Sequence, residues 1–97
     1  MKVFIDGRTQ NNTPEKEIET NTRLINEAFK KYGKNIEIIR PYEDGYYPGG
    51  VNHRIYALGK SVERLASCQH AMFLSWTIAS DESTLLAGIW EDWRRDK

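Results

Sequence analysis

Two polar loops in this sequence each follow a short apolar stretch and begin with residue types that bind small molecules. The first loop follows residues 2–5 and starts with Asp6, Gly7 and Arg8. Asp6 could accept a hydrogen bond from a ribose hydroxyl or a base edge, although Asp-Gly after a strand is also ordinary turn chemistry. Arg8 could pair with a phosphate through its planar guanidinium, or it could be a solvated charge. We therefore treat all three as candidate ligand-binding residues.

The second loop follows the apolar residues 71–74 and contains five further candidates, Ser75, Trp76, Thr77, Ser80 and Asp81. It lies before a predicted helix N-terminus, where free backbone N–H groups attract an anion. The same residue types are common N-caps, and Asp81 would repel a phosphate. We expect this loop to contribute ligand contacts. Glu82, the next residue, is the fallback for an acidic catalytic group, since no other catalytic residue is indicated.

A third candidate segment, residues 42–50, alternates tyrosine with turn-forming residues. Tyr42, Tyr46 and Tyr47 could stack on a base or line a pocket, because aromatic side chains offer a flat apolar surface. Packing over the sheet or in a subunit contact would explain the same residues. We expect at least one of the three to touch a ligand.

The pattern does not support a metal or cofactor site. His53 and His70 have no cysteine or second histidine at ligand spacing, so we predict no zinc site and no cofactor. Cys68 is the single cysteine and stands where a predicted helix ends before a buried strand. This position favours a buried thiol over a reactive one.

Hydrophobic periodicity places these loops between alternating strands and helices. We predict strands at residues 2–5, 35–40 and 71–74, which are short and apolar. The first helix begins at Thr13 and Pro14, an N-cap and a first-turn proline, and ends at Gly33. The last begins near Ser80 and Asp81. The apolar stripes predicted for the three helices are Ile18, Ile25, Ala28, Phe29 and Tyr32; Ile55, Leu58, Val62 and Leu65; and Leu85, Leu86, Ile89, Trp90 and Trp93.

This alternation predicts one α/β domain over residues 1–97, a small three-layer Rossmann-like sandwich with helices on both faces of a parallel sheet. Right-handed crossovers favour the strand order 2-1-3. In such a sheet a crevice is expected between the loops after Ile5 and Leu74, and that crevice is the default ligand site.

Composition limits the partners and the location of the chain. Its 97 residues carry 14 basic and 14 acidic side chains, and no Lys/Arg run exceeds two residues, so we expect no nucleic-acid partner. The apolar stretch near the amino terminus is too short for a signal peptide or a membrane span. This predicts a cytoplasmic protein without a membrane partner. The exposed edges of a three-stranded sheet and the tryptophans of the last helix favour a homo-oligomer.

Two segments resemble the nucleoside 2-deoxyribosyltransferase-like superfamily, in particular its short, often phage-encoded members of unassigned function. VFIDGRT stands where those proteins have a strand ending in a Ser-Gly-Pro-like turn. YALGKSVERLASCQHAMFLSW stands where they have a Leu-Gly-Lys-Ser helix, an Ala-Asp pair and a strand ending in a Trp-containing loop. The resemblance implies a flavodoxin-like fold, assembly into homo-oligomers, and a nucleoside or nucleotide bound at the carboxyl ends of the strands.

The sequence departs from this family at its catalytic positions. Family enzymes use a Glu nucleophile on the helix after the third strand. An ungapped placement puts Leu85 there, a small shift offers Thr84 or Leu86, and Gln69 replaces the acid of the Ala-Asp pair. We therefore expect a non-catalytic protein that binds or sequesters a nucleotide or a nucleotide-derived signalling molecule, and that could be a phage anti-defence protein.

Two alternatives remain open. The chain could be an active nucleoside N-glycosidase or deoxyribosyltransferase that uses Glu82, Asp6 or a carboxylate from another subunit. It could also be a protein-interaction inhibitor of a host factor, with Trp76, Trp90 and Trp93 forming the contact surface.

Overall fold

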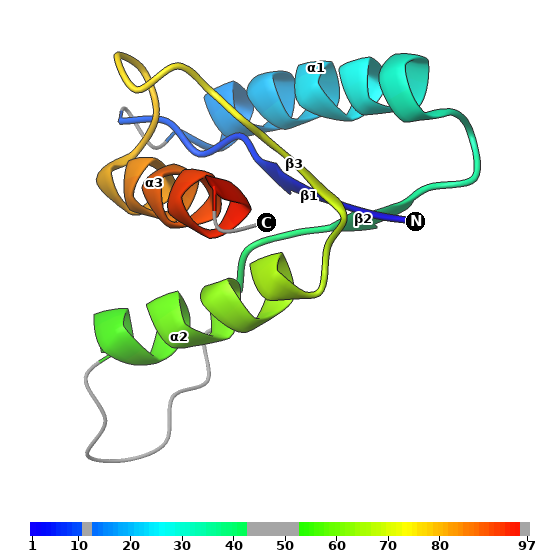
Figure 1. Ribbon diagram of the computed structural model, residues 1–97. Coiled ribbons are helices and arrows are strands. Elements are labelled where there is room, and N and C mark those ends of the chain that lie inside the picture. The colour runs from blue at the N-terminus through cyan, green and yellow to red at the C-terminus, as the bar shows by residue number, and fades with distance from the viewer. Residues whose placement is uncertain (11–12, 43–52, 96–97) are drawn as a thin grey trace.

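The computed structural model describes residues 1–10, 13–42 and 53–95, and these residues form alternating strands and helices (Figure 1). The elements in chain order are β1 (Lys2–Asp6), α1 (Pro14–Tyr32), β2 (Glu37–Ile39), α2 (His53–Ala66), β3 (His70–Phe73) and α3 (Asp81–Arg95). The predicted order of elements is confirmed. β2 is shorter than predicted, and β3 begins and ends one residue earlier.

The three strands form one parallel sheet in the order β2-β1-β3, which confirms the predicted fold class and strand order. β1 is the central strand, with Val3 opposite Ile38 of β2 and opposite His70 of β3. Because β1 is covered on both sides by strands and on both faces by helices, its carboxyl end is a fixed position from which side chains can be presented.

Side chains of β1 alternate between two separate cores, as expected for a strand. Val3 and Ile5 face α1 and pack with its buried residues Leu24 and Ala28. Phe4 faces the opposite side, where α2 and α3 lie (Figure 1), and packs with their buried residues, among them Leu65, Leu86 and Trp90. The same alternation turns Asp6, the last residue of β1, toward the side of α2 and α3.

The capping signals of α1 are confirmed. The Thr13 hydroxyl accepts a hydrogen bond from the Lys16 N–H, and Pro14 occupies the first turn. Gly33 ends the helix with φ of 95°, a left-handed conformation that glycine adopts without steric cost.

The predicted apolar stripe of α1 is partly wrong. Ile18 is 67% exposed, and Thr20 is buried instead, in line with Leu24 and Ala28 at a spacing of four residues. The Thr20 hydroxyl donates a hydrogen bond to the carbonyl of Gly7, so a polar contact sets which face of the helix meets the sheet. Ile18, two residues earlier, therefore lies on the opposite face.

The helices on the other face differ from their predicted stripes at the ends nearest the carboxyl edge of the sheet. Leu65 of α2 and Leu86 of α3 are buried as predicted, whereas Ile55 and Leu85 are exposed. The three tryptophans differ in exposure. Trp90 is buried with its ring 5.3 Å from that of Trp93, which is partly exposed near the end of α3, whereas Trp76 is exposed in the loop before α3.

Candidate functional site

The loop after β1 is paired with the loop before α3, so these two loops do not enclose the predicted crevice. The Gln10 N–H donates to the Ile78 carbonyl over 3.0 Å, and the Ser80 N–H donates to the Arg8 carbonyl over 3.0 Å. Between these bonds Thr9 and Ala79 form an antiparallel bridge. This pairing closes the space expected between the two loops and fixes Arg8 beside the start of α3.

Gly7 is held against α1. Its N–H donates to Asn21 Oδ1 over 2.9 Å, and its carbonyl accepts from the Thr20 hydroxyl. A Cβ atom at this position would lie only 2.8 Å from the backbone nitrogen of Asn21, which leaves no room for any other residue without movement of the helix. Gly7 therefore positions the loop, and its contacts are with α1.

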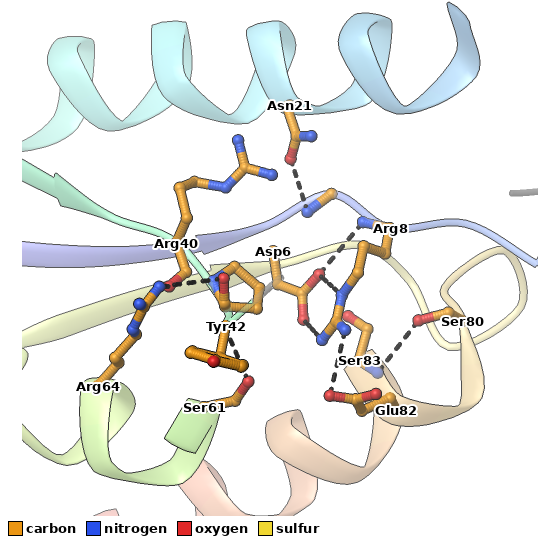
Figure 2. A network of polar contacts seen from close by, with 12 residues as sticks. Asp6, Arg8, Asn21, Arg40, Tyr42, Ser61, Arg64, Ser80, Glu82 and Ser83 are labelled. Carbon is orange, nitrogen blue, oxygen red and sulfur yellow. Dashed lines mark hydrogen bonds and ion pairs between the residues drawn. The ribbon is translucent and has the colours of Figure 1, made fainter. Parts of the chain in front are cut away.

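Asp6 and Arg8 form a two-point ion pair at the carboxyl end of β1 (Figure 2). Arg8 Nε donates to Asp6 Oδ1 over 2.9 Å, and Arg8 Nη2 donates to Asp6 Oδ2 over 2.7 Å. The Arg8 backbone N–H also reaches Oδ1 over 3.2 Å. The Asp6 side chain is fully buried, and its carboxylate is occupied by Arg8.

Glu82, in the first turn of α3, contacts the remaining terminal nitrogen of Arg8. The distance from Arg8 Nη1 to Glu82 Oε1 is 3.2 Å, so the guanidinium lies between two carboxylates (Figure 2). Burial alone would lower the pKa of Arg8. The hydrogen bonds and the charges of Asp6, with a smaller contribution from Glu82, outweigh that effect and raise the pKa of Arg8 above its ordinary value.

A cavity of about 670 Å³ opens beside this ion-pair network. Arg8, Ser80, Asp81 and Glu82, four of the predicted site residues, lie in its wall. They are joined there by Thr9, Gln10, Leu58 and Leu85. The cavity is thus formed by the loop after β1, by α2 and by the start of α3. It lies on the α2 and α3 side of the paired loops, at the end of the sheet where the crevice was predicted.

Ser80 serves the start of α3 in two ways. Its hydroxyl accepts a hydrogen bond from the Ser83 N–H over 3.2 Å, and its carbonyl accepts from the Thr84 N–H. This is the N-cap that the sequence suggests, and it fixes the turn that carries Asp81 and Glu82. Asp81 is exposed at the cavity wall.

Three predicted residues of the second loop lie away from the cavity. The Ser75 and Thr77 hydroxyls hydrogen-bond to each other over 3.0 Å, and the Ser75 carbonyl accepts from the Ile78 and Ala79 N–H groups. Ser75, Trp76 and Thr77 therefore form a closed turn of their own. Trp76 is 75% exposed, and none of the three lines the cavity.

Of the three tyrosines, Tyr42 lies within the described residues, and Tyr46 and Tyr47 lie outside them. The Tyr42 N–H donates to the Ser61 hydroxyl of α2 over 3.0 Å (Figure 2). Its ring meets Tyr56 edge-on at 5.7 Å and faces the Arg64 guanidinium at 5.2 Å. These contacts attach Tyr42 to α2, and it is not among the described residues that line the cavity.

The sequence offered a weak signal for the cavity residues that it did not single out. Thr9 and Gln10 belong to the same polar loop as Arg8, so extending the candidate segment by two residues would have included them. Leu58 and Leu85 gave no such signal, because they occupy stripe positions of amphipathic helices, where burial in the core is the usual outcome.

Cys68, predicted as a buried thiol, is 3% exposed. Burial raises the pKa of its thiol, and the nearby Ser67 hydroxyl and Lys2 charge only partly offset this. In residues 1–10, 13–42 and 53–95, no three His, Cys, Asp or Glu side chains are grouped so that they could hold a metal ion.

Comparison with protein-family models, with curated proteins and with solved structures finds no match to this chain. None of the described helices is both long enough and apolar enough to cross a bilayer.

Proposed function

We propose that this protein binds a nucleoside or a nucleotide-derived small molecule without converting it. The observation that carries the proposal is the cavity of about 670 Å³ at the carboxyl end of β1, walled by Arg8, Asp81 and Glu82. Ligands of open α/β sheets bind at this end of the strands. The resemblance to the nucleoside 2-deoxyribosyltransferase-like superfamily supports the same ligand class, and Leu85 at the expected nucleophile position supports binding without turnover. A protein with this property would sequester its ligand.

The charges around the cavity favour the nucleoside part of such a ligand over its phosphates. All three guanidinium nitrogens of Arg8 already face carboxylate oxygens, and Asp81 adds a further carboxylate at the wall. A phosphate would have to displace Asp6 or Glu82 from Arg8 and would lie near like charges. We infer that base and ribose enter the cavity and that any phosphate stays outside it.

The test is a binding panel on the purified chain with nucleosides, nucleoside phosphates and cyclic dinucleotides. Thermal shift would report binding, and chromatography of the recovered small molecules would report conversion. We expect stabilisation by at least one nucleoside-containing compound, which is recovered intact. If no compound on the panel raises the melting temperature, the proposal is wrong.

A second candidate function is nucleoside N-glycosidase or deoxyribosyltransferase activity that uses Glu82. The observation in its favour is that Glu82 lies in the cavity wall with its side chain 32% exposed, beside the Arg8 guanidinium. An accessible carboxylate is what a nucleophile at an anomeric carbon requires.

Release of free base from a nucleoside would establish this second function, provided that Glu82→Gln abolishes it. Thr84→Ala, an exposed substitution two residues further along α3 and outside the cavity wall, is the matched control and should retain release. Intact recovery of every nucleoside would exclude the second function and leave the binding proposal.

A further inference from the structure

Two carboxylates in the cavity wall, those of Glu82 and Asp81, have oxygen atoms that can still accept hydrogen bonds. Oε1 of Glu82 is buried and forms an ion pair with Arg8 Nη1 over 3.2 Å without hydrogen-bond geometry, and Oε2 has no hydrogen-bond partner in the part of the chain that the structure describes. The side chain of Asp81, its exposed neighbour, likewise makes no hydrogen bond or ion pair with the described residues. Ionised carboxylates only accept hydrogen bonds, so a ligand that satisfies this wall must bring donors.

A second, independent feature of the same cavity also calls for a polar ligand atom. Thr9 lines the cavity and is 4% exposed, and its Oγ1 atom has no hydrogen-bond partner among the described residues. A buried hydroxyl without a partner is unfavourable, and such groups in folded proteins usually mark a site for an ordered water or a ligand.

The cavity wall also contains two apolar side chains, Leu58 and Leu85, which a flat ring can contact through its faces. Leu85 follows Glu82 by three residues on α3, so the two side chains lie on the same side of that helix. Leu58 approaches from α2. A heteroaromatic ring buries its faces against such side chains and keeps its polar edge for hydrogen bonds, whereas a ribose has no apolar face to bury.

We propose that the cavity recognises a nucleobase through an exocyclic amino group, which donates a hydrogen bond to the free carboxylate oxygen of Glu82. This inference rests on the proposed function and adds the part of the ligand that determines specificity. A hydrogen bond to an ionised acceptor is stronger than a neutral one, and loss of the donor leaves the carboxylate oxygen facing the ring without a partner.

The test compares nucleosides that differ only in that amino group. Adenosine is paired with purine riboside, and guanosine with inosine, with affinities measured by calorimetry on the full chain. We expect the amino-bearing member of at least one pair to bind about tenfold or more tightly than its amino-free partner, as expected for a hydrogen bond to a charged group. Equal affinity within both pairs would overturn the inference while leaving the proposed function standing. Absence of binding by all four nucleosides overturns the inference, and the wider panel of nucleoside phosphates and cyclic dinucleotides then decides the proposed function.

The Glu82→Gln variant locates the contact. Its amide oxygen can still accept from Arg8, but its NH₂ group then faces the ligand in place of the carboxylate oxygen. We expect the preference for the amino group to fall to about twofold or less, with Thr84→Ala keeping the full preference. If the preference is unchanged in Glu82→Gln, the amino group is recognised elsewhere and the assignment to Glu82 is wrong. Circular dichroism of both variants distinguishes a lost contact from a lost fold.

Discussion

The Asp6 carboxylate and the Arg8 guanidinium, two residues apart in the chain, pair through two parallel hydrogen bonds of 2.9 and 2.7 Å at the carboxyl end of the central strand. Asp6 is the buried partner, and Arg8 reaches from it to the cavity and to Glu82. This pair connects the end of β1 to the start of α3. Its integrity should therefore affect both stability and ligand binding.

We expect Asp6→Asn to destabilise the fold by about 3 kcal/mol. The substitution keeps the size of the side chain but removes the charge that offsets burial of Arg8, and breaking a buried ion pair from one side typically costs about 3–5 kcal/mol. Urea denaturation would measure the loss. Asp81→Asn, which removes an exposed carboxylate from the same cavity, is the control and should change stability by less than about 0.5 kcal/mol. Similar stability of the two variants would show that Arg8 does not depend on Asp6.

We expect Gly7→Ala to destabilise the chain by about 1–3 kcal/mol. The new methyl group would meet the backbone of Asn21 in α1, which cannot move aside as a side chain can, and overpacking of this kind has that cost. Gly88→Ala is the matched control, because a Cβ atom there meets no heavy atom of the described residues within 4 Å outside the backbone of its own helix. That control should raise the melting temperature, since alanine is favoured over glycine inside a helix by about 1 kcal/mol.

These contacts also indicate how far the sequence alone leads. The caps of α1 could be predicted because Thr13, Pro14 and Gly33 act through local geometry, and the strand order could be predicted because right-handed crossovers leave few topologies for this alternation of strands and helices. The pairing of Thr9 with Ala79 could not, because it joins two loops far apart in the sequence through backbone groups that every residue carries. The ion pair of Arg8 with Glu82 could not be predicted either, because its side chains also come from segments far apart in the sequence.

The apolar stripes predicted for the helices were the other source of error in the prediction from sequence. Periodicity assigns Leu85 and Leu86 equally to the apolar face of α3, and only the position of the helix on the sheet decides that Leu86 enters the core while Leu85 reaches the cavity. In α1 the buried hydroxyl of Thr20 made the corresponding choice, through a hydrogen bond to Gly7 that composition does not reveal.

The tryptophans should differ sharply in their contribution to stability. We expect Trp90→Ala to cost about 3–5 kcal/mol, because this side chain is 5% exposed and packs with the core that contains Phe4 and Leu86. Trp76→Ala should stay within about 0.5 kcal/mol, since its side chain projects from the loop before α3. Chemical denaturation of the two variants would show the contrast, and equal losses would contradict the separation of these residues into core and loop.

The buried thiol of Cys68 predicts a loss of stability at alkaline pH. Burial raises the pKa of this thiol above its ordinary value of 9.0, so the unfolded chain releases the thiol proton at a lower pH than the folded chain does. Below a pH of about 9 both states hold the proton and the preference of the folded state for the neutral thiol contributes fully. Above that pH the unfolded state ionises first, and the free energy of unfolding declines until the folded-state pKa is passed. We expect the difference in stability between the wild type and Cys68→Ala to shrink from pH 7.5 to pH 10, as measured by urea denaturation at each pH.

The burial of Cys68 should also protect its thiol from a disulfide reagent in the folded protein, and unfolding in 8 M urea should make the thiol reactive. Rapid reaction without denaturant would show instead that Cys68 is accessible.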